Sequence, residues 1–259
     1  MIKICYNASM EMMNETLRHL SDLYRRAERQ NSYTYSGFLS PAEQAAFLAA
    51  PPRGGISCTF EGGAPAAERR ILVFGSENDF GYPPEPPITV LAVRPVSEKF
   101  AETLTHRDWL GAVLALGIER PLIGDILIRE KSAYILCLEQ IADYICTNLT
   151  EVRRTAVRVT AEAGPVPELA PVLKEEQLNV ASERLDAVVA AFCGLARGKA
   201  DALFAAEKVF VNSLPAKDGS KRLKEGDIFS VRGFGKGIYD GITKETKKGR
   251  YYITVRRYI

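Results

Sequence analysis

The chain has 259 residues, of which 46% are hydrophobic and 25% charged, a composition typical of a folded globular protein rather than a disordered or fibrous one. Its five cysteines lack Cys-x-x-Cys spacing, its two histidines are isolated, and no apolar run is long enough to span a bilayer, so we expect a cytoplasmic protein without disulfides, metal or cofactor. The net charge of +2 divides into −5 over residues 1–181 and +7 over residues 182–259, which predicts a basic C-terminal module with a polyanionic partner.

The N-terminal region, residues 1–70, is predicted to be a mostly helical arm. Between residues 9 and 30, apolar side chains recur at helical spacing at Met13, Leu17, Leu20 and Tyr24. A second helix is expected to begin at Pro41, with Ser40 as its N-cap. Residues 51–70 are rich in glycine and proline, and they are interpreted as a loose connection to the next domain.

The middle domain, residues 71–163, is predicted to be a ferredoxin-like α/β plait. A strand is expected at residues 70–75, and from residue 88 the runs follow the order β-α-β-β-α-β. Trp109 is expected in the core of this domain. The third strand offers one aromatic residue, Tyr134, so the base-stacking signature of RNA-binding plaits is missing and an RNA role for this domain rests on fold analogy alone.

The C-terminal module, residues 182–259, is predicted to be a small α+β domain that makes the whole chain an α+β protein. Residues 164–181, with three prolines in their first half, are interpreted as a linker. Ser182 is the expected N-cap of a first helix that Gly194 ends, and a second helix, a strand at 208–212, a turn and another strand follow. The tail is expected to be a hairpin with its polar turn at residues 247–249.

Landmark residues of this module resemble the RNA-binding domain named after ribosomal protein S-four. They are Arg184-Leu185-Asp186, residues 195–200, the stretch VFVN at 209–212, Gly226-Asp227 and Val231-Arg232-Gly233, in that order. The resemblance implies RNA-facing roles for Arg184, Arg197, Lys199, Lys208, Asn212 and Lys236. We add Lys221 and Arg222 on charge alone. The family often has Ser-Arg at the helix junction, whereas this chain has Ala196-Arg197, so the hydroxyl is lost and the charge is kept.

Physical chemistry supports an RNA-facing role for these cations, although each taken alone is equally well explained as ordinary solvated surface. Arg184 lies off the apolar stripe of the first predicted helix, and Arg197 and Lys199 lie at the start of the second. Helix N-termini favour anions, and guanidinium groups bind phosphate oxygens bidentately. We therefore expect the basic residues to contact RNA phosphates.

Asp186 raises the alternative of an enzyme, because an Arg-Leu-Asp triplet also surrounds the catalytic aspartate of pseudouridine synthases. Those enzymes continue with a Thr-Ser-Gly turn, whereas this chain continues as AVVAAF within a helix. In the first turn of a helix, Asp186 is better explained as a brace for backbone N–H groups and a nearby arginine.

Two glycine-rich stretches imitate phosphate-binding loops. GLARGKA (194–200) is one residue shorter than a Walker loop and ends in alanine, and GFGKG (233–237) leads into a strand instead of a helix. Both are interpreted as turns.

Four further stretches look like the YlmH family of bacterial proteins, and they are spread in order along most of the chain. They are SYTYSGFLSPAEQAAF (32–47), LGIERPLIGDILI (116–128), NLTEVRRTAVRV (148–159) and FSVRGFG (229–235). The resemblance implies a non-enzymatic protein that binds ribosomal RNA, the large ribosomal subunit and peptidyl-tRNA during rescue of stalled ribosomes. We expect it to be a monomer. A link to cell division is also associated with the family name.

Two rival functions remain open at this stage. One is an RNA-modifying enzyme, a pseudouridine synthase or methyltransferase, that uses the basic module to bind substrate RNA. The other is a scaffold for division proteins in which the basic surface is incidental.

Overall fold

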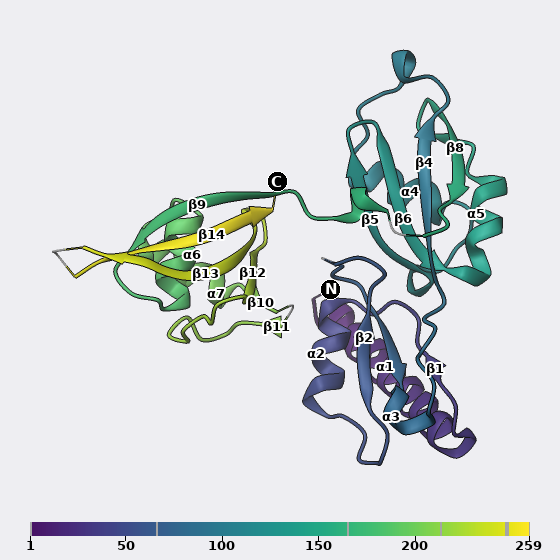
Figure 1. Ribbon diagram of the computed structural model, residues 1–259, viewed down its shortest axis with the longest axis horizontal. Coiled ribbons are helices and arrows are strands. Elements are labelled where there is room, and N and C mark those ends of the chain that lie inside the picture. Colours follow the sequence, from purple (N-terminus) through teal and green to yellow (C-terminus); the bar gives the residue numbers. More distant parts are fainter. Residues whose placement is uncertain (1, 66, 165, 213, 247–248, 259) are drawn as a thin grey trace. The chain divides into compact units, whose positions relative to one another are not determined.

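The computed structural model describes residues 2–65, 67–164, 166–212, 214–246 and 249–258 (Figure 1). The chain divides into two compact units, Met1–Ala170 and Pro171–Ile259. The first unit contains the N-terminal region and the plait, and the second contains the basic module. The predicted α+β class is confirmed.

The N-terminal region combines helices with a small sheet. Its elements are α1 (Ile2–Gln30), β1 (Thr34–Tyr35), α2 (Pro41–Ala49), β2 (Cys58–Glu61), β3 (Ile71–Phe74) and α3 (Glu77–Phe80). Ser40 caps α2 as predicted, and its backbone N–H donates to the Glu43 carboxylate at 2.6 Å, which closes a capping box.

The sheet of this region corrects two expectations. The order is β1-β3-β2, so residues 51–70 are not a loose connection throughout, and β3 pairs with this sheet instead of the plait. The strand β2 was missed because it is short and lies among glycines and prolines. Its alternation of half-buried and exposed residues places Cys58 and Phe60 against the apolar cluster beneath α1 and α2.

The plait has the predicted order of helices and strands. Its elements are β4 (Ile88–Pro95), η1 (Glu98–Phe100), α4 (His106–Leu114), η2 (Arg120–Leu122), β5 (Ile123–Arg129), β6 (Ser132–Leu138), η3 (Glu139–Ile141), α5 (Ala142–Asn148), β7 (Glu151–Val152) and β8 (Thr155–Ala161). The strands pair antiparallel in the order β5-β6-β4-β8-β7. Without the short β7, this is the order expected of a split βαβ fold.

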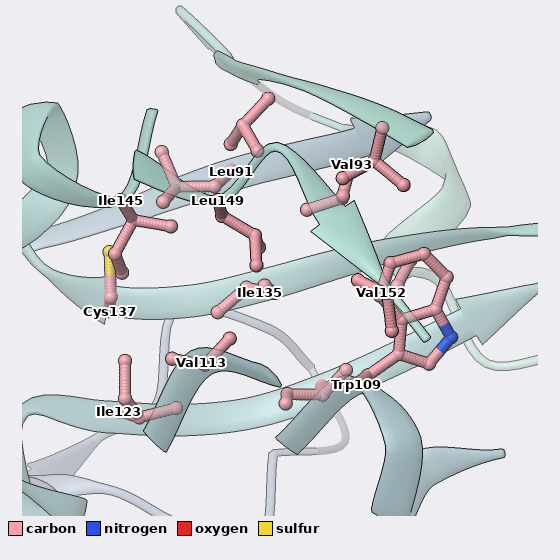
Figure 2. Packing of buried hydrophobic residues seen from close by; sticks show 14 of the residues in the cluster. Leu91, Val93, Trp109, Val113, Ile123, Ile135, Cys137, Ile145, Leu149 and Val152 are labelled. Atoms are coloured by element: carbon pink, nitrogen blue, oxygen red, sulfur yellow. The ribbon is translucent and has the colours of Figure 1, made fainter. Parts of the chain in front are cut away.

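One face of the plait sheet packs against α4 and α5. Figure 2 shows Leu91, Val93 and Ile135 from the strands gathered with Trp109 and Val113 of α4. Trp109 is fully buried, as the sequence predicts. This layer is the main core of the first unit.

The opposite face of the plait sheet is also buried, because the N-terminal region covers it. Phe38 and Val73 pack there with Leu136, and the 3-10 turn η4 (Pro167–Leu169) adds Leu169. At Gly124, a Cβ would lie 2.6 Å from the Phe38 ring, so the absence of a side chain permits the close approach. Both faces of this sheet are therefore occupied.

The C-terminal unit is a six-stranded antiparallel sheet with two helices. Its elements are β9 (Leu173–Val180), α6 (Leu185–Phe192), α7 (Arg197–Ala205), β10 (Val209–Val211), β11 (Leu214–Pro215), β12 (Ile228–Val231), β13 (Gly235–Glu245) and β14 (Tyr251–Tyr258). The strand order is β11-β10-β12-β13-β14-β9. The predicted terminal hairpin is present as β13 and β14, whereas residues 247 and 248 of its expected turn lie outside the described residues.

The strand β9 corrects the expectation of a linker over residues 164–181. It pairs with β14 along its whole length, from Leu173 opposite Tyr258 to Val180 opposite Tyr251. It was missed because LKEEQLNV is largely polar and shows little apolar alternation. An edge strand tolerates such a sequence, since only Val180 is fully buried.

Both helices of this unit pack on the same face of the sheet. Val188 and Phe192 of α6 and Phe204 of α7 share an apolar cluster with alternate residues of the strands, among them Phe229 and Val255. A Cβ at Gly237 would lie 3.0 Å from the Phe192 ring, so this glycine lets α6 lie close to β13. The second face of the sheet carries the remaining, alternate side chains.

Candidate nucleic-acid interface

The predicted site is centred on Asp186, whose carboxylate joins the starts of the two helices. Arg184 precedes α6 as its N-cap, in place of the predicted Ser182, and Arg197 is the first residue of α7. Arg184 Nη2 lies 3.1 Å and Arg197 Nη2 lies 2.7 Å from Asp186 Oδ2. The structure thus brings together two cations that are separated by thirteen positions in the sequence.

Asp186 is buried and fully engaged by the chain itself. It is 5% exposed, and it accepts hydrogen bonds from Nε and Nη2 of both arginines and, at 2.8 Å, from the Ala187 backbone N–H. Burial by itself raises the pKa of this carboxyl, but the hydrogen bonds from Arg197 and Arg184 outweigh it and lower the pKa below the ordinary value. Asp186 is therefore an ionised anchor for the two guanidinium groups.

The two arginines remain accessible although they are anchored. The side chain of Arg184 is 43% exposed and that of Arg197 is 52% exposed. Each uses its Nε and Nη2 for Asp186, which leaves the Nη1 side of the fork for another acceptor. The hydrogen bonds that Arg197 donates to Asp186 also raise the pKa of the Arg197 guanidinium, so its charge is permanent.

The loop that connects β11 to β12 is tied to the start of α6. The backbone N–H of Leu185 donates to Lys221 O at 2.8 Å, and that of Asp186 donates to Gly219 O at 2.9 Å. Arg184 and Arg222 form an isolated β-bridge. Lys221 and Arg222, predicted on charge alone, are therefore held beside Arg184, and both are exposed.

Two further predicted lysines lie on the surface of the same unit. Lys199 is exposed in the first turn of α7. Lys208 is exposed immediately before β10, and its carbonyl accepts from the Arg232 backbone N–H at 2.9 Å. The register of β10 and β12 therefore places Lys208 next to Arg232, on the sheet and not at the junction of α6 and α7.

Asn212 stabilises a turn in this structure. Its backbone is left-handed, with φ of 49°, its Nδ2 donates to Asp227 Oδ1 at 2.8 Å, and its Oδ1 accepts from the Ile228 N–H at 2.9 Å. Its role as an RNA contact stays a prediction, and its carboxamide already braces the start of β12.

Lys236 lies on β13, on the face of the sheet that the helices do not cover. Its Nζ is 5.0 Å from the centroid of the Tyr258 ring. Lys236 therefore belongs with the strands, apart from the arginines that Asp186 anchors.

Each glycine-rich stretch is a turn only in part, because GLARGKA runs into α7 at Arg197 and GFGKG runs into β13 at Gly235. Gly194 is left-handed, with φ of 64°, after the end of α6. Gly233 and Gly235, with φ of 88° and 114°, turn the chain from β12 into β13. Because neither stretch forms a strand-loop-helix unit, neither has the geometry of a phosphate-binding loop.

Tyr134, the aromatic residue on the third strand of the plait, is not available for base stacking. It is 5% exposed and lies in the apolar cluster that Phe38 and Leu136 share. The sheet face with which RNA-binding plaits stack bases is thus covered in this protein.

Sequence reasoning missed the aromatic residues that accompany the cations of the C-terminal sheet. The Arg232 guanidinium lies 4.9 Å from the centroid of the Phe210 ring, and Arg257 lies 3.6 Å from that of Phe192. Arg232 lies within the quoted Val231-Arg232-Gly233 landmark, but its partner on β10 depends on strand register. The alternation of Val209, Phe210 and Val211 was the available signal for an outward Phe210.

Neither a cluster of metal ligands nor a membrane-spanning helix occurs in the described part of the chain. Within residues 2–65, 67–164, 166–212, 214–246 and 249–258, three or more His, Cys, Asp or Glu side chains nowhere gather as metal ligands would. In the same part of the chain, every helix is too short or too polar to cross a bilayer.

Comparisons with known proteins point to one family. The family model described as "Putative RNA-binding domain in YlmH" matches residues 87–164, which correspond to the plait. The Ribosome-associated protein quality control protein P2 of Bacillus subtilis (strain 168) is 28% identical over 236 residues, which cover 90% of this chain and 90% of that protein.

A solved structure of Cell division protein ylmH from Streptococcus pneumoniae is 22% identical, covers 58% of this chain and 90% of that chain, and has a TM-score of 0.47, too low to support an inference. The S-four-type assignment of the C-terminal unit stays a prediction. The family model and the relative that spans nearly the whole chain confirm the relationship to the YlmH family that the sequence predicts.

Proposed function

We propose that this protein binds RNA on the ribosome as a component of nascent-chain quality control. The name of the Bacillus subtilis relative and the description of the family model support ribosome association and RNA binding. In finer detail, we propose that the C-terminal unit binds structured ribosomal RNA of the large subunit and that the protein also contacts peptidyl-tRNA, as a cytoplasmic monomer without catalytic activity.

The anchoring of Arg184 and Arg197 by Asp186 is the observation that carries this proposal. Long cationic side chains lose rotamer freedom when they bind a phosphate, and that loss reduces affinity. Here the carboxylate fixes both guanidinium groups before RNA arrives, with distances of 3.1 and 2.7 Å to Oδ2. The exposed Nη1 sides then meet phosphate oxygens with little further ordering.

The neighbouring cations enlarge the site to a surface suited to a folded RNA. Lys199 follows Arg197 by two residues in the first turn of α7, and Lys221 and Arg222 lie beside Arg184 through the backbone bonds of their loop. Asp186 offsets one of these five positive charges, and Asp218 near Arg184 and Asp201 near Arg197 offset two more, so positive charge remains in excess. The residual positive potential attracts phosphates and makes affinity fall with salt.

The structure gives no support to Asp186 as the catalytic residue of an RNA-modifying enzyme. A catalytic carboxylate must reach the substrate, and both oxygens of Asp186 are buried and already accept bonds from Arg184, Arg197 and Ala187. The same bonds suit a residue that positions its neighbours.

Co-sedimentation with isolated large ribosomal subunits tests the proposed function. The wild-type chain should pellet with the subunits, and Arg184→Ala and Arg197→Ala combined should reduce binding at least tenfold, since a charge-assisted contact contributes roughly 1.5 kcal/mol or more. Arg256→Ala is the matched control, because Arg256 is bound bidentately to Asp240 on the strands, at 2.6 and 2.8 Å. Equal binding by the double variant and the wild type would contradict the proposal.

A further inference from the structure

The helix-free face of the C-terminal sheet carries a compact group of aromatic and basic side chains. Because side chains alternate along a strand, the residues between those buried under the helices point to this face. Val209 and Val211 are buried against the helices, so Phe210 points the other way, and Val231 likewise places Ser230 and Arg232 on that face. Lys236 and Tyr258 lie there by the same alternation around Gly237 and Arg257.

Strand register aligns these residues in two adjacent rows. Phe210 pairs with Ser230, Ser230 pairs with Lys236, and Lys236 contacts Tyr258 on the next strand. One step along, Lys208 and Arg232 form the second row. We call Lys208, Phe210, Arg232, Lys236 and Tyr258 the aromatic-basic face.

Cations and rings are already paired within this face. Arg232 lies 4.9 Å from the centroid of Phe210, and Lys236 lies 5.0 Å from that of Tyr258. Each cation lies over its ring, so a base that replaces it on the ring face leaves the cation next to the phosphate of that base. Phe210 and Tyr258 are three strands apart, roughly 14 Å at ordinary strand spacing, so they would receive two different bases.

Charge separates this face from the rest of the same sheet surface. Among the described residues of the two rows, none is acidic, and three are basic. Two residues before Tyr258 on β14, the cation Arg256 is neutralised by Asp240 and lies opposite Glu175 on β9. The positive charge is therefore concentrated where the aromatic rings lie.

We propose that the aromatic-basic face is a second RNA-binding surface, which takes an unpaired segment of RNA by stacking bases on Phe210 and Tyr258. Lys208, Arg232 and Lys236 contact the phosphates of that segment. This inference deepens the proposed function and rests on it, but it concerns a different face of the unit from the arginines that Asp186 anchors. A group of cations beside aromatic rings, with no acidic residue among the described residues of the two rows, fits RNA better than it fits a protein partner.

Fluorescence anisotropy of the full chain with two labelled oligonucleotides tests the inference. One probe is a short single-stranded RNA of mixed sequence, and the other has the same length and charge but lacks bases. Phe210→Leu and Tyr258→Leu keep apolar bulk and remove the ring. Each should weaken binding of the base-bearing probe about fivefold or more, because stacking contributes roughly 1–3 kcal/mol per base, and should leave binding of the abasic probe unchanged.

Tyr252→Leu is the matched control for the aromatic rings. Tyr252 lies on β14 with Tyr258, is 38% exposed, and is separated from it by the ion-paired Arg256. The Tyr252→Leu variant should bind both probes as tightly as the wild type does. Arg197→Ala should weaken both probes to the same extent, because it removes charge and no stacking surface.

The outcomes distinguish the further inference from the proposed function. If both Leu variants bind the base-bearing probe as tightly as the wild type does, the inference is wrong. The face would then be better explained as a contact surface for a protein partner. Equal loss on both probes also overturns it, since misfolding or lost charge would then explain the effect. If large subunits are still bound in either case, the proposed function stands without the second surface.

Discussion

The two large antiparallel sheets of this protein are alike on one face, which helices cover, and differ on the other. Each packs two helices on its first face. The second face of the plait sheet is sealed by Phe38, Val73 and Leu169, whereas that of the C-terminal sheet presents Phe210, Lys236 and Tyr258. A helix-free sheet face is therefore a core layer in one unit and a candidate binding surface in the other.

The difference argues against base stacking on the surface that fold analogy suggests. RNA-binding plaits stack bases on the helix-free face, and in this plait the aromatic residue at that position, Tyr134, is buried. An arrangement of half-buried rings and cations appears instead on the sheet of the other unit. What covers a sheet, more than its topology, decides what the sheet can bind.

The largest expected effect is a loss of protein stability when a side chain in the covered, helix-free face of the plait sheet is shortened. Leu136→Ala should lower the free energy of unfolding by about 2–5 kcal/mol, because Leu136 is fully buried between the plait and the N-terminal region. Urea unfolding followed by the fluorescence of Trp109, the single tryptophan, measures it. A change below about 1 kcal/mol would mean that this face is not a core layer.

The next effect concerns the anchored arginines of the C-terminal unit. Asp186→Asn should lower the free energy of unfolding by about 1–3 kcal/mol, because a buried acceptor of charged donors is weakened. The far-UV circular dichroism of the C-terminal unit should report the loss, whereas the Trp109 fluorescence transition should stay in place.

The same variant has a defined pH dependence. The pKa of Asp186 is lowered in the folded state, so its stabilisation is complete above the unfolded value near 3.9 and is lost as pH falls through the folded pKa. The stability difference between the wild type and Asp186→Asn should therefore be full at neutral pH and shrink below about pH 4. A difference that grows in acid would contradict an ionised Asp186.

A smaller effect is expected for one cation of the proposed RNA surface. Arg197→Ala should weaken RNA binding by about tenfold and make the slope of log affinity against log salt shallower by about 1, because one phosphate contact is removed. Filter binding over a salt series measures both values. An unchanged slope would mean that Arg197 does not contact a phosphate.

The smallest effect lies on the uncovered face. Phe210→Leu should change the free energy of unfolding by less than about 1 kcal/mol, because Phe210 is only half-buried and apolar bulk is kept. Thermal unfolding by circular dichroism measures it. If Phe210→Leu lowered the free energy of unfolding as much as Leu136→Ala, the helix-free faces of both sheets would be core layers, and the contrast between them would be wrong.

The plait could be predicted because its strands and helices have strong and distinct periods. In β6, the run SAYILCL is apolar on both faces, which is typical of a strand buried on both sides, but this run alone does not tell which segment covers it. That segment is Phe38 and β3, more than fifty residues away in sequence.

The cations of the site could be predicted from resemblance and charge, but their partners could not. The contact between Asp186 and Arg197 depends on how α6 and α7 cross. The pairs of Arg232 with Phe210 and Lys236 with Tyr258 depend on strand register across β10, β12, β13 and β14. The strand β9 was missed because its polar sequence gains its order from pairing with β14.

The salt dependence of binding to isolated large ribosomal subunits tests the central claim most directly. If about five phosphates are neutralised, log affinity should change with log salt at a slope of roughly −3.5 to −4.5. Affinity should then fall roughly 100- to 500-fold between about 50 and 200 mM salt. No binding at low salt, or an affinity that barely changes over this range, would contradict a C-terminal unit that holds RNA through its phosphates.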